Sequence, residues 1–298
     1  MPIMWQAEFT ADVSEDGLSC GEFLKRRGVS RRLMVKLKRM ESGMTCNGER
    51  IRTVDTVRAG DTISLRNVDE SFLEPNSELC VPVVYEDRRV VVFDKPAGMP
   101  VHPSIKHQGD TLGNCFAAMY PGSTFRPVNR LDRDTSGLCA VAKSEYAASI
   151  LSGGISKAYF AVTEGKPVPH FIENSPIKWY KTGDIYRIEA PIGRAGESII
   201  RREVRSDGQY AATEYTILKS DGRHSLVRVL PETGRTHQIR VHFSSVGHPL
   251  AGDDLYGGSL ACCREQALHC GEMTLPDESG KMVSLSSELR KNMADIIK

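Results

Sequence analysis

The residues best suited to chemistry lie between positions 129 and 138, in the segment Asn-Arg-Leu-Asp-Arg-Asp-Thr-Ser-Gly-Leu. Two carboxylates, Asp132 and Asp134, alternate there with Arg130 and Arg133. The Thr-Ser-Gly that follows favours a turn, which lets the backbone approach a ligand closely. A carboxylate held among arginines can serve as a nucleophile or a base, although Asp and Arg on loops also commonly form solvated ion pairs. The segment is therefore a candidate reactive site whose interpretation depends on the elements around it.

Two strands are predicted to position this segment and a second set of polar side chains. A continuous apolar run at residues 138–142 directly follows the segment and predicts a buried strand. Residues 156–163 alternate as a strand does, which puts Lys157 and Tyr159 on one face. Such a Lys/Tyr pair is also common on exposed edge strands. Helical patterns occupy residues 111–120 and 145–155.

The second half of the chain predicts a hairpin followed by a helix. Residues 212–218 and 225–230 flank a Ser-Asp-Gly-Arg turn, and a helix is expected to run on to about residue 246. On it His237 and Arg240, three apart, would be neighbours on one face. We interpret His237 as a structural donor rather than a metal ligand. The helical pattern resumes at 286–297 as a closing helix, and the Pro- and Gly-rich loop 95–103 is suited to lining a site.

Positive charge is segregated near the N-terminus. The net charge is only +1, yet eight of residues 25–39 are Lys or Arg and none is acidic. Ser19 with Glu22 predicts a capping box that opens one helix, and Ser30 is expected to cap a second helix over residues 31–40. A segregated basic face is what phosphate binding requires.

Residues 14–66 resemble the small RNA-binding module of a ribosomal small-subunit protein and of tyrosyl-tRNA synthetases. The resemblance includes the Asn47-Gly48 turn and the Ala-Gly-Asp-Thr-Ile ending at residues 59–63. It implies RNA contact through Arg26, Arg27, Arg31, Arg32, Lys36, Lys38 and Arg39. The alternative interpretation is an ordinary solvated basic helix face.

Composition and missing motifs narrow the class of protein. At 298 residues, 40% hydrophobic and 26% charged, the chain is typical of a globular protein, with no apolar run of membrane-spanning length and no signal peptide. We therefore expect a cytoplasmic protein with no membrane partner. Its eight cysteines lack zinc spacing and favour reduced thiols, with no metal site expected. The signatures of nucleotide hydrolysis, dinucleotide redox, zincin and serine-hydrolase chemistry do not occur.

Six separated motifs together resemble the RluA-type family of RNA pseudouridine synthases. They are Asp-Lys-Pro-Ala-Gly (94–98), Arg-Leu-Asp-Arg-Asp-Thr-Ser-Gly (130–137), Lys-Ala-Tyr (157–159), Thr-Gly-Arg-Thr-His-Gln-Ile-Arg (233–240), Gly-His-Pro-Leu-Ala-Gly-Asp (247–253) and Gln-Ala-Leu-His (266–269). The resemblance implies an α+β catalytic domain with a mixed, mostly antiparallel sheet. The expected domains are a small α/β RNA-binding module with a leading strand at 1–68, a flexible linker at 69–79 and the catalytic domain at 80–298.

The same resemblance implies roles for six residues. Asp132 would be the catalytic aspartate, Tyr159 the stacking partner of the target base, and Arg240 the basic partner of Asp132. We expect Asp132 to be buried, so that removing Arg240 would strand a charge at a cost on the order of 3–5 kcal/mol. Arg130 would help to turn the base out, Leu268 would contact it, and Asn129 stands where many members have His; Asn can hydrogen-bond but cannot become charged.

The function implied is isomerisation of specific uridines to pseudouridine in structured RNA, with base flipping and without a cofactor or metal. We favour large-subunit ribosomal RNA over transfer RNA, and expect a monomer. Two other classes remain open. One is a non-catalytic RNA-binding or assembly protein, and the other is a hydrolytic N-glycosidase in which Asp132 and Asp134 share one face of an extended segment.

Overall fold

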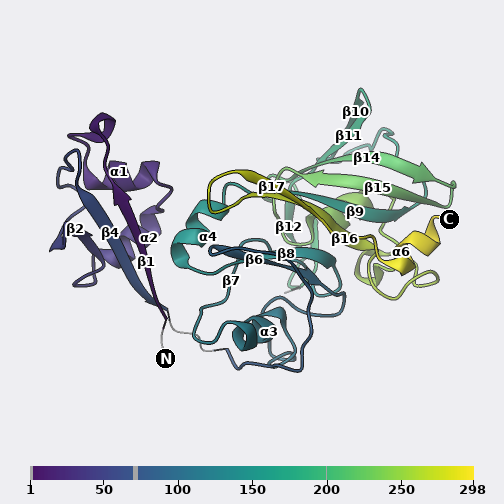
Figure 1. Cartoon of the computed structure of the whole chain (residues 1–298). Helices are drawn as coiled ribbons and strands as arrows, with labels where there is room; N and C mark the ends of the chain where they lie inside the picture. The colour runs from purple at the N-terminus through teal and green to yellow at the C-terminus, as the bar shows by residue number, and fades with distance from the viewer. Residues whose placement is uncertain (1–2, 70–72, 199) are drawn as a thin grey trace.

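The computed structural model describes residues 3–69, 73–198 and 200–298, which form two bodies, each built on its own sheet (Figure 1). The N-terminal body, residues 3–69, has the antiparallel strand order β1-β4-β2-β3. Its elements are β1 (Ile3–Thr10), the 3-10 helix η1 (Val13–Glu15), α1 (Cys20–Arg26), α2 (Arg31–Leu37), β2 (Met44–Cys46), β3 (Glu49–Arg50) and β4 (Thr62–Asp69). Phe23, Leu24 and Leu33 from the helices pack in the core of this body with Ile63 and Leu65 from β4.

Local sequence signals account for both helices of the N-terminal body. The Ser19 hydroxyl accepts a hydrogen bond from the backbone of Glu22 and the Glu22 carboxylate accepts one from the backbone of Ser19, which confirms the predicted capping box. Ser30 caps α2 as expected. Helix α2 ends at Leu37 rather than near residue 40, because the chain turns back at Gly43, where a Cβ would lie 2.1 Å from the Leu37 carbonyl oxygen.

The larger body is an α+β structure with a mixed sheet, as predicted. Its strand order is β10-β11-β14-β15-β9-β16-β8-β6-β5, with β17 on β16 and β7 on β8, and β12 and β13 form a separate two-stranded sheet. Among the pairs in the described residues, β8 and β16 run parallel and the others antiparallel. The strands are β5 (Val83–Glu86), β6 (Val90–Lys95), β7 (Arg126–Pro127), β8 (Ser136–Ala142), β9 (Ser156–Glu164), β10 (Lys178–Thr182), β11 (Ile185–Glu189), β12 (Ile192–Arg194), β13 (Arg202–Val204), β14 (Ala212–Ser220), β15 (His224–Pro231), β16 (Leu268–Pro276) and β17 (Met282–Ser286).

Among its described residues, this body also has five short helices: α3 (Leu112–Met119), α4 (Glu145–Leu151), α5 (Gln238–Ser245), η2 (Asp254–Tyr256) and α6 (Lys291–Ile296). Every residue of β8 is buried, as its apolar run predicted. Helix α4 ends at Leu151, four residues before the predicted end, because Gly153 and Gly154 follow and glycine disfavours helix. No helix within the described residues is long and apolar enough to cross a bilayer.

The C-terminal end also differs from the predicted pattern. We expected one last strand and a closing helix from residue 286. Instead β17 forms a second strand antiparallel to β16, and its pairing holds the chain extended through Ser286. Helix α6 therefore begins only at Lys291.

The described part of the expected linker lies against the larger body. Leu73 and Leu79 pack on the main core. The backbone N–H of Asn76 donates to the Asn114 carbonyl at 3.0 Å, and its side-chain amide donates to the Gly109 carbonyl at 2.8 Å. These contacts attach residues 73–79 beside α3, which differs from the flexible linker expected there; residues 70–72 of that linker lie outside the described residues.

His242 on α5 ties that helix to the sheet. Its imidazole is fully buried, with Nδ1 2.8 Å from the Thr213 hydroxyl and Nε2 3.0 Å from the Ala190 carbonyl. Both contacts fit a neutral ring, which accepts from the hydroxyl and donates to the carbonyl. Burial lowers the pKa of His242 to about 4, whereas an unfolded histidine titrates near 6.5. The unfolded chain therefore takes up this proton first, and stability falls as the pH drops from about 6.5 to about 4.

We expect His242 to contribute about 2 kcal/mol to the loss of unfolding free energy between pH 7 and pH 5. Urea unfolding of the His242→Gln variant should show a shallower dependence of stability on pH over this range. His170→Gln, which changes an exposed histidine, serves as the control and should keep the wild-type slope. An equally steep slope in the His242 variant would contradict the prediction.

Candidate active site

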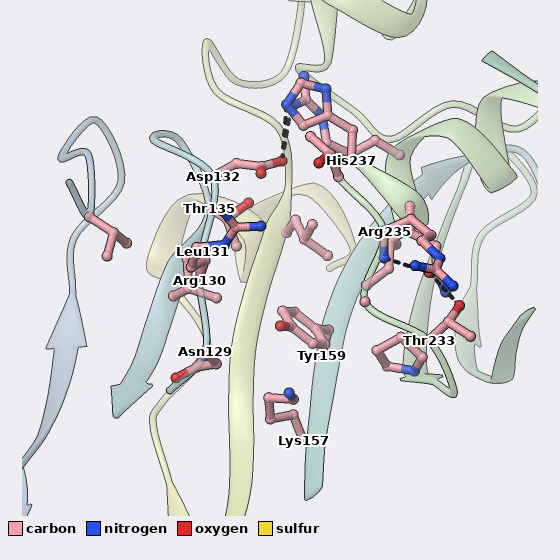
Figure 2. Close-up of a pocket in the computed structure, with 18 of the residues that line it drawn as sticks. Asn129, Arg130, Leu131, Asp132, Thr135, Lys157, Tyr159, Thr233, Arg235 and His237 are labelled. Atoms are coloured by element: carbon pink, nitrogen blue, oxygen red, sulfur yellow. Dashed lines mark hydrogen bonds and ion pairs between the residues drawn. The ribbon is translucent and has the colours of Figure 1, made fainter. Parts of the chain in front are cut away.

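A cleft of about 940 Å³ lies over the middle of the larger sheet (Figure 2). It brings together all six side chains predicted for catalysis or substrate binding: Asn129, Arg130, Asp132, Tyr159, Arg240 and Leu268. They come from the loop before β8, from β9, from α5 and from the start of β16. Segments far apart in the sequence thus converge on one hollow.

The loop that carries Asp132 is a turn held against β16. The backbone N–H of Thr135 donates to the Asp132 carbonyl at 3.1 Å. Gly137 follows with φ +102°, and a Cβ there would lie 2.3 Å from the Cys270 carbonyl oxygen. Only glycine allows β8 to pass so close to β16 in this conformation, so Gly137 helps to set where the turn leaves the sheet.

The extended arrangement of Asp132 and Asp134 that we considered is wrong. The segment turns, and both oxygens of Asp134 accept hydrogen bonds from the neighbouring Arg133, at 2.8 and 2.9 Å. Asp134 is therefore engaged in a local ion pair and does not join Asp132 as a second carboxylate toward a common substrate. This arrangement gives no support to the N-glycosidase hypothesis.

Lys95 connects the loop that carries Asp132 to the loop that follows β6. Its side chain is fully buried, and its Nζ donates to the carbonyls of Pro96, Met99 and Arg133 at 2.7–2.9 Å. Burial lowers the pKa of this amine to about 8. Because all three protons of an ammonium find acceptors, the group can stay charged at neutral pH. The sequence marked the loop of residues 95–103 as a site wall but did not reveal this role for Lys95.

Arg240 is shared between two carboxylates. Its Nε and Nη2 donate to both oxygens of Asp253 at 2.7 and 2.8 Å, and its Nη1 donates to Asp132 Oδ2 at 3.1 Å. Burial is the largest single influence and works against the charge of Arg240, but the hydrogen bonds and negative charges of Asp253 and Asp132 together outweigh it and raise the pKa of the guanidinium above its ordinary value. The predicted contact between Arg240 and Asp132 is present, and Asp253 is the partner that the sequence did not reveal.

The two carboxylates differ in solvent exposure, and the expectation that Asp132 is buried is wrong. The Asp132 side chain retains 28% exposure, whereas that of Asp253 retains 1%. Removing Arg240 would thus strand the buried charge of Asp253, while Asp132 would still meet water. A buried ion pair holds the guanidinium, and the guanidinium in turn directs a partly open carboxylate.

His237 is a second basic group beside the loop that carries Asp132. It precedes α5 instead of lying on it, in a left-handed conformation with φ 57°. Its Nε2 is 3.8 Å from Asp132 Oδ2, and its Nδ1 is 2.8 Å from the Tyr256 hydroxyl. Burial lowers the pKa of this imidazole below its ordinary value, although Asp132 works in the opposite direction. The histidine that we interpreted as a structural donor therefore lines the cleft beside Asp132.

Tyr159 and Leu268 form an apolar floor to the cleft. They lie on the adjacent strands β9 and β16, where Tyr159 pairs with Cys270 and Leu268 with Ala161. Burial raises the pKa of the Tyr159 phenol far above its ordinary value, so the ring remains neutral. Lys157 lies on the same strand, two residues before Tyr159, and also lines the cleft (Figure 2).

Asn129 and Arg130 have different environments. The Asn129 amide donates to the Leu138 carbonyl at 3.0 Å and accepts from the Ala140 N–H at 2.8 Å, so both of its ends bind the backbone of β8. An uncharged amide suits this task, and its polar atoms are occupied by the protein. Arg130 is exposed at the cleft and makes no hydrogen bond or ion pair with any other described residue.

The seven predicted RNA-binding residues of the N-terminal body fall into two groups, those in ion pairs and those exposed without one. Arg27 forms an ion pair with Glu15, and Lys36 forms one with Glu145 of the larger body at 2.6 Å. The remaining five are exposed and have no ion-pair partner in the described part of the chain: Arg26, Arg31, Arg32, Lys38 and Arg39.

The described residues contain no group of three or more His, Cys, Asp or Glu side chains placed to hold a metal ion. All eight cysteines are free thiols. His269, which lies near three cysteines in the sequence, contacts the Ser136 hydroxyl through Nδ1 at 2.8 Å.

Comparison with known proteins identifies the class to which this fold and cleft belong. Residues 89–245 match the family described as RNA pseudouridylate synthase. Among solved structures, human RNA pseudouridylate synthase domain containing 1 shares 25% identity with a TM-score of 0.54, over 72% of this chain and 86% of that chain. The architecture is therefore that of a pseudouridine synthase.

Individual relatives agree with this class. The RNA pseudouridine synthase YjbO of Bacillus subtilis is 36% identical over 259 residues, which cover 83% of this chain and 87% of YjbO. The ribosomal large subunit pseudouridine synthase D of Pseudomonas aeruginosa is 37% identical over 227 residues, which cover 72% of this chain and 66% of that protein. The chain belongs to the RNA pseudouridine synthase family and is an isomerase that acts on RNA.

The unequal burial of the two carboxylates predicts unequal effects on stability. Asp253→Asn leaves the buried Arg240 without its main counter-charge and should lower the free energy of unfolding by about 3 kcal/mol. Asp132→Asn removes a partly solvated pair and should change it by less than about 1 kcal/mol. Chemical unfolding of the two variants beside the wild type measures the difference. Equal losses would mean that the two carboxylates bind Arg240 equally strongly.

Proposed function

We propose that this enzyme isomerises specific uridines of large-subunit ribosomal RNA to pseudouridine and that Asp132 is its catalytic residue. The observation that carries the proposal is the environment of Asp132. Its Oδ2 accepts from Arg240, whereas its Oδ1 accepts no hydrogen bond from any described residue and its side chain is partly open to the cleft. One carboxylate oxygen is held and the other is available to a ligand.

The choice of RNA is supported by several relatives. Proteins of Pseudomonas aeruginosa, Xanthomonas campestris and Yersinia pestis, each named ribosomal large subunit pseudouridine synthase D, are 37%, 36% and 34% identical to this chain. These identities extend over about three quarters of the chain. By analogy with their names, we assign the large ribosomal subunit as the source of the substrate.

The reaction requires little equipment beyond such a carboxylate. The bond from ribose C1′ to uracil N1 breaks, the uracil turns, and a bond from C1′ to C5 forms. A proton leaves C5 and N1 gains one, so there is no net change in composition or redox state and no external group is needed. Asp132 can attack the sugar, attack C6 of the base, or act as a base at C2′. Arg240 holds Asp132 in its orientation through the hydrogen bond to Oδ2.

The other cleft residues are suited to holding the base. Extruding a uridine from structured RNA costs a few kcal/mol, and stacking on an aromatic ring returns about 1–3 kcal/mol. Tyr159 presents a neutral ring for that purpose, with Leu268 beside it. Arg130, exposed at the mouth of the cleft without a protein partner, is free to occupy the position that the base vacates.

The test is site-resolved mapping of pseudouridine in total RNA from cells with and without the gene. We expect one or a few positions of large-subunit ribosomal RNA to lose the modification, and wild-type protein but not Asp132→Asn to restore it. Asp134→Asn is the matched control, because that carboxylate is engaged with Arg133, and it should restore the modification at near the wild-type level.

Three results would contradict parts of the proposal. Restoration by Asp132→Asn would exclude this carboxylate as the catalytic group. Loss confined to transfer RNA would replace the substrate while leaving the reaction intact. Release of free uracil from RNA by the purified enzyme would replace isomerisation by hydrolysis.

A further inference from the structure

Helix α4 of the larger body carries a contact with the N-terminal body that the chemistry in the cleft does not require. The Tyr146 ring stacks on Trp5, with centroids 6.2 Å apart, and meets Phe9 edge-on at 5.4 Å. It packs against the core of the N-terminal body. Its hydroxyl donates to the Arg27 carbonyl at 3.0 Å. An aromatic side chain of one body thus completes the apolar core of the other.

Polar groups on both sides of Tyr146 extend the contact. The Ser149 hydroxyl donates to the Gly28 carbonyl and accepts from the Ser30 N–H, both at 2.8 Å, which joins α4 to the turn between α1 and α2. Glu145 receives Lys36 at 2.6 Å and the Asn67 amide at 3.1 Å. Residues in both turns of α4 therefore bind specific atoms of the N-terminal body, whose helix α2 lies beside α4 in Figure 1.

The same helix adjoins one end of the cleft. After α4 ends at Leu151, the chain reaches Ile155, Ser156 and Lys157, which all line the cleft. Asp132 lies before the opposite end of β8, and the seven residues of that strand span roughly 23 Å at about 3.3 Å each. The N-terminal body is thus attached beyond the Lys157 end of the cleft, at a defined distance from the reactive carboxylate.

The surface next to this contact is cationic and free. Lys25 and Arg26 on α1, and Arg31, Arg32, Lys38 and Arg39 on or next to α2, are exposed and have no ion-pair partner among the described residues. Lys157 likewise has no partner there and carries positive charge into the cleft. In contrast, Arg27 and Lys36 are engaged in pairs that support the body and its attachment.

We propose that α4 is a docking platform that holds the N-terminal body at the Lys157 end of the cleft, so that both form one continuous RNA-binding surface. RNA that leaves the cleft past Lys157 would meet the free cations of α1 and α2 roughly seven nucleotides from the target uridine, at about 3.4 Å per stacked nucleotide. The N-terminal body then selects RNA whose phosphates lie at that distance. The RNA ligand in this inference rests on the proposed function, whereas the docking itself does not.

The first test removes the contact without touching the free cations or the cleft. Tyr146→Ala should release the N-terminal body, and small-angle scattering of the full chain without RNA should give a larger radius of gyration. Tyr180→Ala, which changes an exposed tyrosine of β10, is the matched control and should leave the radius unchanged. A Tyr146→Ala variant that folds and keeps the wild-type radius would overturn the docking.

The second test separates positioning from damage to the cleft. Two RNAs containing a mapped site are compared, a minimal stem-loop and a fragment extended by about fifteen nucleotides on each side. We expect Tyr146→Ala to lower kcat/KM on the extended RNA about tenfold, through loss of effective concentration, and to leave the stem-loop unaffected. Equal loss on both RNAs, no loss on either, or a gain on the extended RNA would overturn the proposal.

A charge exchange provides a variant that retains the aromatic contact. Lys36→Glu should weaken binding of the extended RNA, and adding Glu145→Lys should recover most of that loss if Lys36 acts through docking. Without recovery, Lys36 would be an RNA ligand and this ion pair would have no role in docking. If the wild type binds the extended RNA but isomerises no uridine, the proposed function fails while scattering and affinity still test the platform.

Discussion

The geometry of the cleft depends on one guanidinium shared between two carboxylates. Arg240 is surrounded by protein, and its charge is compensated mainly by Asp253, which is almost fully buried. Because a buried charge without a partner is strongly unfavourable, α5 and the loop that ends at Asp253 cannot move apart. The remaining nitrogen of Arg240 meets Asp132 from a fixed direction. The pair of Arg240 with Asp253 thus provides most of the stability of this three-residue cluster, while Asp132 is left partly open to a ligand.

A second buried cation, Lys95, holds the other side of the loop that carries Asp132. Lys95 donates to the carbonyls of two loops, one of which includes the residue next to Asp132. Gly137 adds a steric constraint, since the close approach of β8 and β16 leaves no room for a side chain. Reaction rates are sensitive to displacements of about 1 Å, so the catalytic role proposed for Asp132 requires such attachments. Here they consist of charge burial, backbone hydrogen bonding and the absence of a Cβ.

The N-terminal body is attached to the larger body by specific contacts, which its positive charge alone did not predict. Two of its seven basic side chains predicted to bind RNA are engaged in ion pairs with carboxylates of this chain, and one of those pairs joins the two bodies. Its core is completed by Tyr146 from the other body. Exposed cations lie beside the contact between the two bodies. The exposed cations and the side chains that attach this body to the enzyme are thus different residues in the region of the same two helices.

The sequence by itself determined what depends on neighbouring residues. The capping box at Ser19, the buried run of β8 and the antiparallel pair β14 and β15 follow from local side-chain chemistry and periodicity. The separated motifs identified the family, and they included Asp132, Tyr159 and Arg240. Each of these signals depends on residues that lie close together in the sequence.

The tertiary structure alone decided how distant side chains share partners. Arg240 and Asp132 are 108 residues apart, and Lys36 and Glu145 are 109 apart. No local pattern could show that Asp253 binds Arg240 more closely than Asp132 does, that Asn129 turns its amide to β8, or that His237 leaves the helix to line the cleft. Burial and hydrogen-bond geometry decide such choices, because each polar group takes the partner that packing brings within about 3 Å. These distances exist only once the chain is folded.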